Sequence, residues 1–237
     1  MKRPARVPSQ LSESLHKRLS ANTLAASAAG VSLLALAHPA DAKIVYTPAN
    51  LNIPPGAVPL DLNHDGVADF SLVYSGHTGT TSNGAFFERS LRATPVVSRN
   101  GVLGYRNFAS ALPAGVRIGP KGHFLPSASG TMALYYLRDH STGKTSRFYH
   151  GPWANNGKGV KKRYLGLKFM IHGQVHFGWA RLNVAMKGSK IRGTLTGYAY
   201  ETIPNKPIIA GKTRGKNEAT LGQLAQGASG VSNGGKQ

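Results

Sequence analysis

Apolar and polar residues alternate with a period of two through most of the chain between residues 43 and 210. The clearest run covers residues 164–171, a second covers 175–184 and a third covers 191–201, with short glycine-containing turns between them. Because strand side chains point to opposite faces in turn, this period predicts β-strands with one buried face. The three runs therefore predict an antiparallel meander.

The second run contains a break in its alternation. Its apolar positions are odd-numbered up to Trp179 and even-numbered from Ala180. A shift by one residue moves side chains to the other face of a sheet, so the break predicts a β-bulge or a strand covered on both faces.

Shorter runs of the same kind predict further strands at residues 43–47, 68–75, 85–91, 131–137 and 145–149. Asn100-Gly101 fits a type I′ turn and predicts a hairpin over residues 96–105. The 29 glycines and 14 prolines of the chain are more than long helices tolerate. About nine or ten short strands predict an all-β fold, and we expect an antiparallel β-sandwich of jelly-roll or lectin-like type.

The N-terminal residues have the three parts of a secretory signal peptide. Residues 1–20 are polar and basic, residues 21–37 are apolar and mostly small, and Ala40-Asp41-Ala42 forms an A-x-A site. We therefore expect cleavage of residues 1–42 after Ala42 and a secreted or periplasmic location, with an uncleaved N-terminal anchor as the alternative.

The rest of the chain divides into two parts by composition. Residues 43–210 contain all the aromatic side chains and form the expected β-sandwich domain, whereas residues 211–237 form an expected flexible, Gly-rich basic tail. No apolar stretch after the signal peptide is long enough to cross a membrane.

The chain is strongly basic and contains no cysteine. It has 29 Lys and Arg against 9 Asp and Glu, and removal of residues 1–42 leaves 24 against 7. The lack of cysteine excludes disulfides, Cys-ligated zinc and a thiol nucleophile. The excess of positive charge predicts contact with a polysaccharide or another polyanion.

One motif points to a specific ligand. Residues 61–70 read D-L-N-H-D-G-V-A-D-F, with oxygen-bearing side chains at positions 1, 3, 5 and 9 of a tight loop. Calcium takes about six to eight oxygen ligands, and glycine at position 6 permits the sharp turn. We therefore predict a structural Ca²⁺ site with Gly66 at the turn and the ligands Asp61, Asn63, Asp65, the carbonyl of Val67 and Asp69.

A metal-free, Asx-rich turn is the alternative for this loop, although its three carboxylates would then repel one another. The loop resembles the calcium loops of integrin-type FG-GAP repeats, which join two strands with the same D-x-N-x-D-G-x-x-D spacing. Position 12 is Leu72 rather than Glu and both flanks are strand-like, which disfavours an EF-hand or a dockerin repeat. The resemblance covers ten residues and implies a calcium ion between two strands.

A second resemblance covers about residues 160–210. The segments Y-L-G-L-K-F at 164–169, H-F-G-W-A-R at 176–181 and Y-A-Y-E at 198–201 follow one another. This order resembles a group of uncharacterised exported bacterial proteins, many of which carry PEP-CTERM sorting tails. The resemblance implies an extracytoplasmic β-domain without an established activity. Residues 230–237 lack the apolar helix and basic cluster of a sorting tail, so we do not expect sorting by that route.

Catalytic chemistry has weaker support. Glu88, Asp139 and Glu201 are acids that could form the carboxylate pair of a glycosidase, but no local spacing pairs them. His172 and His176 flank a turn, which disfavours a zinc pair, and there is no G-x-S-x-G elbow. No phosphate-binding loop is present, so no nucleotide cofactor is expected.

Two further features have an ordinary and a functional interpretation. Trp153 fits either a sugar-stacking position on a loop or the core. Five cations between residues 158 and 168 fit a polyanion patch or a solvated strand edge, and we favour the edge.

The sequence therefore predicts a secreted, calcium-stabilised β-sandwich that acts as a binding or structural module of the bacterial envelope or matrix, and not an enzyme. Two alternatives stay open. One is a carbohydrate-active hydrolase on a lectin-like sandwich that uses two of Glu88, Asp139 and Glu201, and the other is a polyanion-binding protein driven by net charge.

Overall fold

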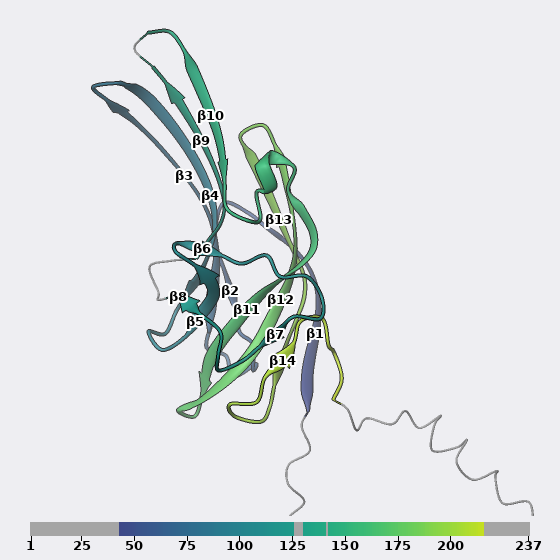
Figure 1. The fold of residues 1–237 in the computed structure, drawn as a ribbon. Coiled ribbons are helices and arrows are strands. Elements are labelled where there is room, and N and C mark those ends of the chain that lie inside the picture. The colour runs from purple at the N-terminus through teal and green to yellow at the C-terminus, as the bar shows by residue number, and fades with distance from the viewer. Residues whose placement is uncertain (1–42, 126–129, 141, 216–237) are drawn as a thin grey trace, which may run out of the picture. The chain divides into compact units, whose positions relative to one another are not determined.

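The computed structural model describes residues 43–125, 130–140 and 142–215 (Figure 1). The predicted signal peptide and residues 216–237 of the predicted tail lie outside these ranges. The described residues form the strands β1 (Ile44–Ile53), β2 (Gly56–Leu60), β3 (Phe70–Thr81), β4 (Gly84–Pro95), β5 (Gly101–Tyr105), β6 (Phe108–Ala109), β7 (Arg117–Ile118), β8 (Phe124–Leu125), β9 (Thr131–Asp139), β10 (Thr145–His150), β11 (Val160–Ile171), β12 (Gln174–Lys187), β13 (Lys190–Glu201) and β14 (Ile208–Ile209). A 3-10 turn, η1 (Asn155–Gly157), precedes β11. Within these ranges no helix is long and apolar enough to span a bilayer.

Twelve of the strands belong to one sheet. Its order is β1-β13-β12-β11-β5-β6-β9-β4-β3-β2, with β10 beside β9 and β8 beside β5, and β7 and β14 form a second, small sheet. The contact of β6 with β9 is parallel, and the other strand pairs of the described chain are antiparallel.

The predicted all-β class is therefore confirmed, but its details differ. The described residues form fourteen strands rather than nine or ten, and the pairing runs without a break from β1 to β2. The strands are thus not divided into the two separately bonded sheets of a sandwich. The sequence missed β2, β6, β7, β8 and β14, because strands of two to five residues are too short to show a period.

The predicted meander is formed by β11, β12 and β13, and its turns fall between residues 171 and 174 and between 187 and 190. Both explanations for the broken alternation of β12 hold. Its register with β13 shifts between Arg181 and Leu182, and its residues 176–180 are all buried.

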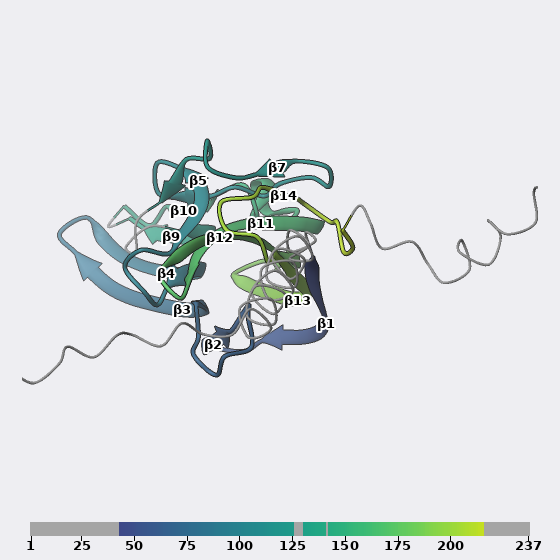
Figure 2. The ribbon, with the colours of Figure 1, turned by 90° about the horizontal axis from the view of Figure 1, so that it is seen from below.

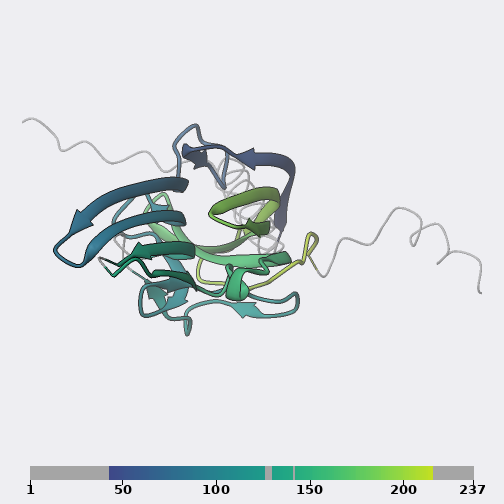
Figure 3. The same cartoon turned by 90° about the horizontal axis from the view of Figure 1, so that it is seen from above.

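The two halves of the large sheet share one core. Buried residues from both halves belong to this core, among them Leu91 of β4 and Leu182 of β12. Gly193 of β13 lies where the halves approach, because a Cβ there would be 2.9 Å from Ile53 Cδ1 and 3.1 Å from Leu91 Cδ2. Figures 2 and 3 show β3 and β4 on one side and β1 and β13 on the other. The sheet is therefore folded over on itself.

The opposite face of β12 is covered by a second cluster. Phe177 and Trp179 pack there with Ile118 of β7 and Ile208 of β14. The Trp179 indole Nε1 also donates a hydrogen bond to the carbonyl oxygen of Lys212, at 3.2 Å. Packing against the domain thus continues a little beyond residue 210, where the sequence places the start of the tail.

The predicted hairpin over residues 96–105 is wrong. β4 ends at Pro95, and β5 pairs with β11, β6 and β8 instead of with residues 96–99. Asn100 is only 3% exposed; its Nδ2 donates to the carbonyl oxygen of Asp69, and its Oδ1 accepts the N–H of Met170, both at 3.1 Å. Asn100 therefore ties the end of the predicted calcium loop to β11.

Candidate functional site

The predicted calcium loop connects β2 to β3. The strands pair up to Leu60 and Phe70, and the N–H of Asp69 donates to the carbonyl oxygen of Leu60 at 3.0 Å, which closes the loop. Leu62 is fully buried and anchors the loop in the core. The strand-like flanks predicted from the sequence are thus confirmed, and residues 61–69 form the loop of the β2–β3 hairpin.

Two of the predicted ligands, Asp61 and Asp65, accept hydrogen bonds from backbone N–H groups of the loop. The two oxygens of Asp61 accept the N–H groups of His64 at 2.7 Å and Gly66 at 2.9 Å. Asp65 Oδ1 accepts the N–H of Val67 at 2.8 Å. Gly66 has a φ of 86°, a left-handed conformation that favours glycine. Each carboxylate oxygen has more than one lone pair, so these bonds leave capacity for a cation.

Asn63 supplies the most informative atom of the loop. Its Nδ2 donates to Asp65 Oδ2 at 2.9 Å, but its Oδ1 is buried and has no hydrogen-bond partner among the described residues. A buried amide oxygen without a partner costs free energy. Because an amide oxygen is a good calcium ligand, a cation in the loop would satisfy this atom.

The carboxylates of the loop have different environments. Asp69 is 7% exposed and accepts the N–H of Leu62 at 2.8 Å. Burial is the main cause that raises the pKa of Asp69 to about 6; the Leu62 bond opposes the rise, and the charges of Asp61 and Asp65 add to it. Hydrogen bonds from Asn63 and then Val67 lower the pKa of the exposed Asp65.

The loop lies beside β1 and β13. His64 Nε2 shares a hydrogen bond of 2.7 Å with Thr47 Oγ1 of β1, and its ring centroid is 5.8 Å from that of Tyr198 of β13. Burial first, and then the charges of Asp61 and Asp69, raise the pKa of Tyr200. Both tyrosines of β13 are therefore close neighbours of the loop.

The loop is the best candidate for a cation in the described chain, although it is not a cluster of acids. Within residues 43–125, 130–140 and 142–215, no three His, Cys, Asp or Glu side chains gather as a metal-binding group. The predicted ligand set differs from such a group because it also uses the amide of Asn63 and the carbonyl of Val67. The Val67 side chain is 61% exposed and takes no part in the core.

The three candidate catalytic acids lie apart. Glu88 of β4 is opposite Tyr136 of β9, so Asp139, three residues further along β9, points to the other face of the sheet. Glu201 at the end of β13 is buried and forms an ion pair with Lys206 at 3.7 Å. Glu201 therefore has a structural partner.

Two other predicted positions are structural. Trp153 is fully buried, and its Nε1 donates to the carbonyl oxygen of Ala109 at 3.1 Å, so it belongs to the core and not to a sugar-binding loop. His176 is 4% exposed, and its Nδ1 donates to the carbonyl oxygen of Glu201 at 3.0 Å. His172 lies in the turn before β12, where Asp65 is within range of its charge.

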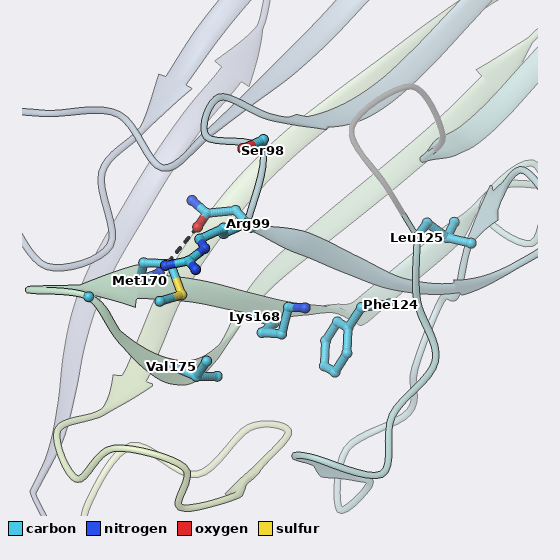
Figure 4. A pocket seen from close by; sticks show the side chains of 9 residues that line it. Ser98, Arg99, Phe124, Leu125, Lys168, Met170 and Val175 are labelled. Carbon is cyan, nitrogen blue, oxygen red and sulfur yellow. Dashed lines mark hydrogen bonds between the residues drawn. The ribbon is translucent and has the colours of Figure 1, made fainter.

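Sequence reasoning missed a basic hollow around Phe124. Its first part, of about 550 Å³, is lined by Arg99 and Lys168 beside Phe124 (Figure 4). The Lys168 Nζ lies 5.4 Å from the Phe124 ring centroid, and the ring packs on Phe177 with centroids 5.8 Å apart. We call this region the Phe124 groove.

The Phe124 groove continues along the segment before β8. Neighbouring hollows of about 420 and 810 Å³ share His123 in their walls, and the larger one is also lined by Arg117 and Lys121. His123 Nδ1 donates to the carbonyl oxygen of Gly104 at 2.8 Å. No Asp or Glu of the described chain lines these three hollows. Of the five clustered cations, Lys168 alone lines them.

Comparison with known proteins gave no relationship: no family model, no curated protein and no solved structure matches this chain.

Proposed function

We propose that the chain is an exported, calcium-stabilised binding module and not an enzyme. The observation that carries this proposal is the loop at residues 61–69, which combines a buried Asn63 oxygen that has no partner among the described residues with a buried Asp69 carboxylate whose pKa the charges of Asp61 and Asp65 help to raise. In this proposal the folded sheet acts as a sandwich-like scaffold and calcium holds the β2–β3 end of it. Asp61, Asn63, Asp65 and Asp69 and the Val67 carbonyl would hold the ion, which would supply positive charge and fix the loop.

The placement of the acids supports binding rather than hydrolysis. A glycosidase needs two carboxylates on either side of one scissile bond. Glu88 and Asp139 point to opposite faces, and Glu201 is engaged by Lys206.

Terbium luminescence tests the metal site, because Tyr198 and Tyr200 lie next to the loop and can sensitise a bound lanthanide. Excitation of tyrosine should give terbium emission that Ca²⁺ displaces and that Mg²⁺ displaces much less, since Mg²⁺ loses its water reluctantly. Asp65→Asn should remove most of this emission, whereas Asp139→Asn, the same change at an exposed acid of β9, should leave it unchanged. Emission that calcium does not displace, or that Asp65→Asn retains in full, would contradict the site.

Polyanion binding is a second candidate function, because the Phe124 groove collects cations without an acid. Replacing Arg99 and Lys168 by Gln should lower the salt concentration at which the protein leaves a heparin column, and reduce the slope of log affinity against log salt by roughly one for each cation. The matched control replaces Lys144 and Arg147, which are exposed cations near the β9–β10 turn. An equal effect of both pairs would mean that net charge, and not the groove, binds the polyanion.

A further inference from the structure

Five ring side chains form an unbroken row across β3, β4, β9 and β10. In the order His77, Phe86, Tyr136, Phe148 and His150, neighbouring ring centroids lie 5.4, 5.9, 6.2 and 6.0 Å apart. The Phe86–Tyr136 and Phe148–His150 pairs are stacked, with interplanar angles of 22° and 11°. We call these side chains the outer aromatic row. Figure 1 shows the far ends of the four strands extending beyond the rest of the described sheet.

Strand register places the whole row on one face. His77 lies opposite Glu88, Glu88 opposite Tyr136, and Tyr136 opposite Phe148. Phe86 is two positions from Glu88 on β4, and His150 is two positions from Phe148 on β10, so their side chains point to the same side. The ring of Phe86 also lies over Gly79, where a Cβ would be only 2.6 Å from Phe86 Cε1. Glycine at this position lets the ring lie across the strand.

The opposite face of these strands carries the structural contacts. Tyr135 is 3% exposed and packs with Phe87 and Tyr149, at centroid distances of 6.2 and 5.4 Å, while the Arg89 guanidinium covers Phe87 at 4.2 Å. In the outer row, by contrast, Phe148 is 42% exposed, and both histidines are exposed. Phe86 and Tyr136 are half-buried between them. A row of rings that is exposed at three of its five members indicates an interaction surface.

The charge of this face selects among ligands. Glu88 and Arg138 are the charged residues that the register places beside the rings, and their charges cancel, although the whole chain carries +20. A polyanion requires cations to neutralise its charges. A second copy of the chain would bring the same excess of positive charge to the contact. A neutral ligand therefore suits the row best.

The shape of the face indicates an extended ligand. The row lines none of the hollows described above, and its neighbouring ring centroids follow one another across four strands at 5.4 to 6.2 Å. A sugar ring has an apolar C–H face that stacks on an aromatic ring and a rim of hydroxyls that bonds to polar neighbours, here His77, Glu88 and His150.

We propose that the outer aromatic row binds a neutral polysaccharide chain, with successive rings stacking against its sugar faces. This inference rests on the binding function proposed above and names its ligand class, but it does not depend on the calcium loop.

Native electrophoresis of the full chain through gels containing hydroxyethyl cellulose, xyloglucan or galactomannan tests this proposal. At least one of these neutral polymers should retard the protein, and high salt should not reduce the retardation. Phe86→Ala and Phe148→Ala should each raise the Kd at least about fivefold, as removal of one stacking ring does at aromatic platforms. Phe148→Tyr keeps a ring and should bind like wild type. Tyr105→Ala removes a ring that is 70% exposed outside the row, and it should have no effect.

Several results would overturn the proposal. One is that none of the three polymers retards the protein. A second is that the alanine variants bind like wild type. A third is that high salt abolishes the retardation and that gels containing dextran sulfate retard the protein more strongly than gels containing the neutral polymers. Self-association that both alanine variants remove would assign the row to a second copy instead. Far-UV circular dichroism identifies a variant that fails to fold, and the other of the two alanine variants, compared with Tyr105→Ala, then still decides the result. If wild type is retarded in the gel but gives no terbium emission that calcium displaces, the calcium site is rejected and the aromatic row is not.

Discussion

Replacing Asp69 by Asn is expected to stabilise the calcium-free protein by about 3 kcal/mol above pH 6, using about 1.36 kcal/mol for each unit of pKa difference. Burial raises the pKa of Asp69 in the folded protein to about 6, against 3.8 for an ordinary aspartate. Between these two values the unfolded chain binds fewer protons than the folded protein. The free energy of unfolding therefore falls as the pH rises from about 4 to about 6. Asparagine does not titrate, and its Oδ1 can still accept the N–H of Leu62.

Urea unfolding at a series of pH values in EDTA measures this effect. The difference between Asp69→Asn and wild type should grow across pH 4 to 6 and then stay constant. Asp139→Asn is the control, because this acid of β9 is exposed and accepts a single side-chain hydrogen bond from the described residues, that of Thr145. If the difference in the free energy of unfolding does not change with pH, the ionised Asp69 carboxylate does not destabilise the folded protein. Saturating calcium should reduce the difference in the free energy of unfolding between Asp69→Asn and wild type, because the ion would neutralise the ionised carboxylates of the loop.

The sequence motif alone does not show which carboxylate of the loop destabilises the calcium-free protein. Asp61, Asp65 and Asp69 look alike in the sequence, which suggests that all three repel one another equally. In the fold, Asp65 is exposed and bonded to Asn63 and Val67, whereas Asp69 is buried next to the core residue Leu62. Burial depends on the packing around β2 and β3, and no local pattern reports it.

Local patterns predicted the parts of the fold that are local. The β11–β12–β13 meander follows from long alternating runs joined by tight turns, and the loop between the strand-like flanks β2 and β3 follows from ten consecutive residues. Asn100 shows where such reasoning fails. Asn-Gly is a strong turn signal, but the side chain of Asn100 bonds to Asp69 and Met170, which are 31 and 70 positions away. These long-range bonds outweigh the local preference.

The surfaces that the sequence did not reveal are built from distant residues. The outer aromatic row draws on positions between 77 and 150, and register alone places them on one face. The Phe124 groove similarly joins Arg99 to Lys168 and Arg117 to Asn205. An alternating strand pattern shows that a side chain faces solvent, but not which other side chains lie next to it.

Calcium is expected to raise the free energy of unfolding by about 2.7 kcal/mol when its free concentration is a hundredfold above the Kd. The unfolded chain does not hold Asp61, Asn63, Asp65 and Asp69 together, so the ion stabilises the folded state alone. We expect a Kd of about 10⁻⁴ to 10⁻³ M, as in extracellular modules, because Leu72 stands where a bidentate Glu would close the loop.

Thermal melting of the full chain in calcium and in EDTA tests the claim that residues 61–69 bind calcium most directly, on wild type and on Asp65→Asn. This variant keeps an oxygen that can accept the N–H of Val67 but loses the charge. Wild type should melt at a clearly higher temperature in calcium, and Asp65→Asn should lose most of that difference, while Asp139→Asn should keep it. Identical wild-type melts in the two buffers, with calcium raised well above millimolar, would show that the loop is a metal-free Asx turn.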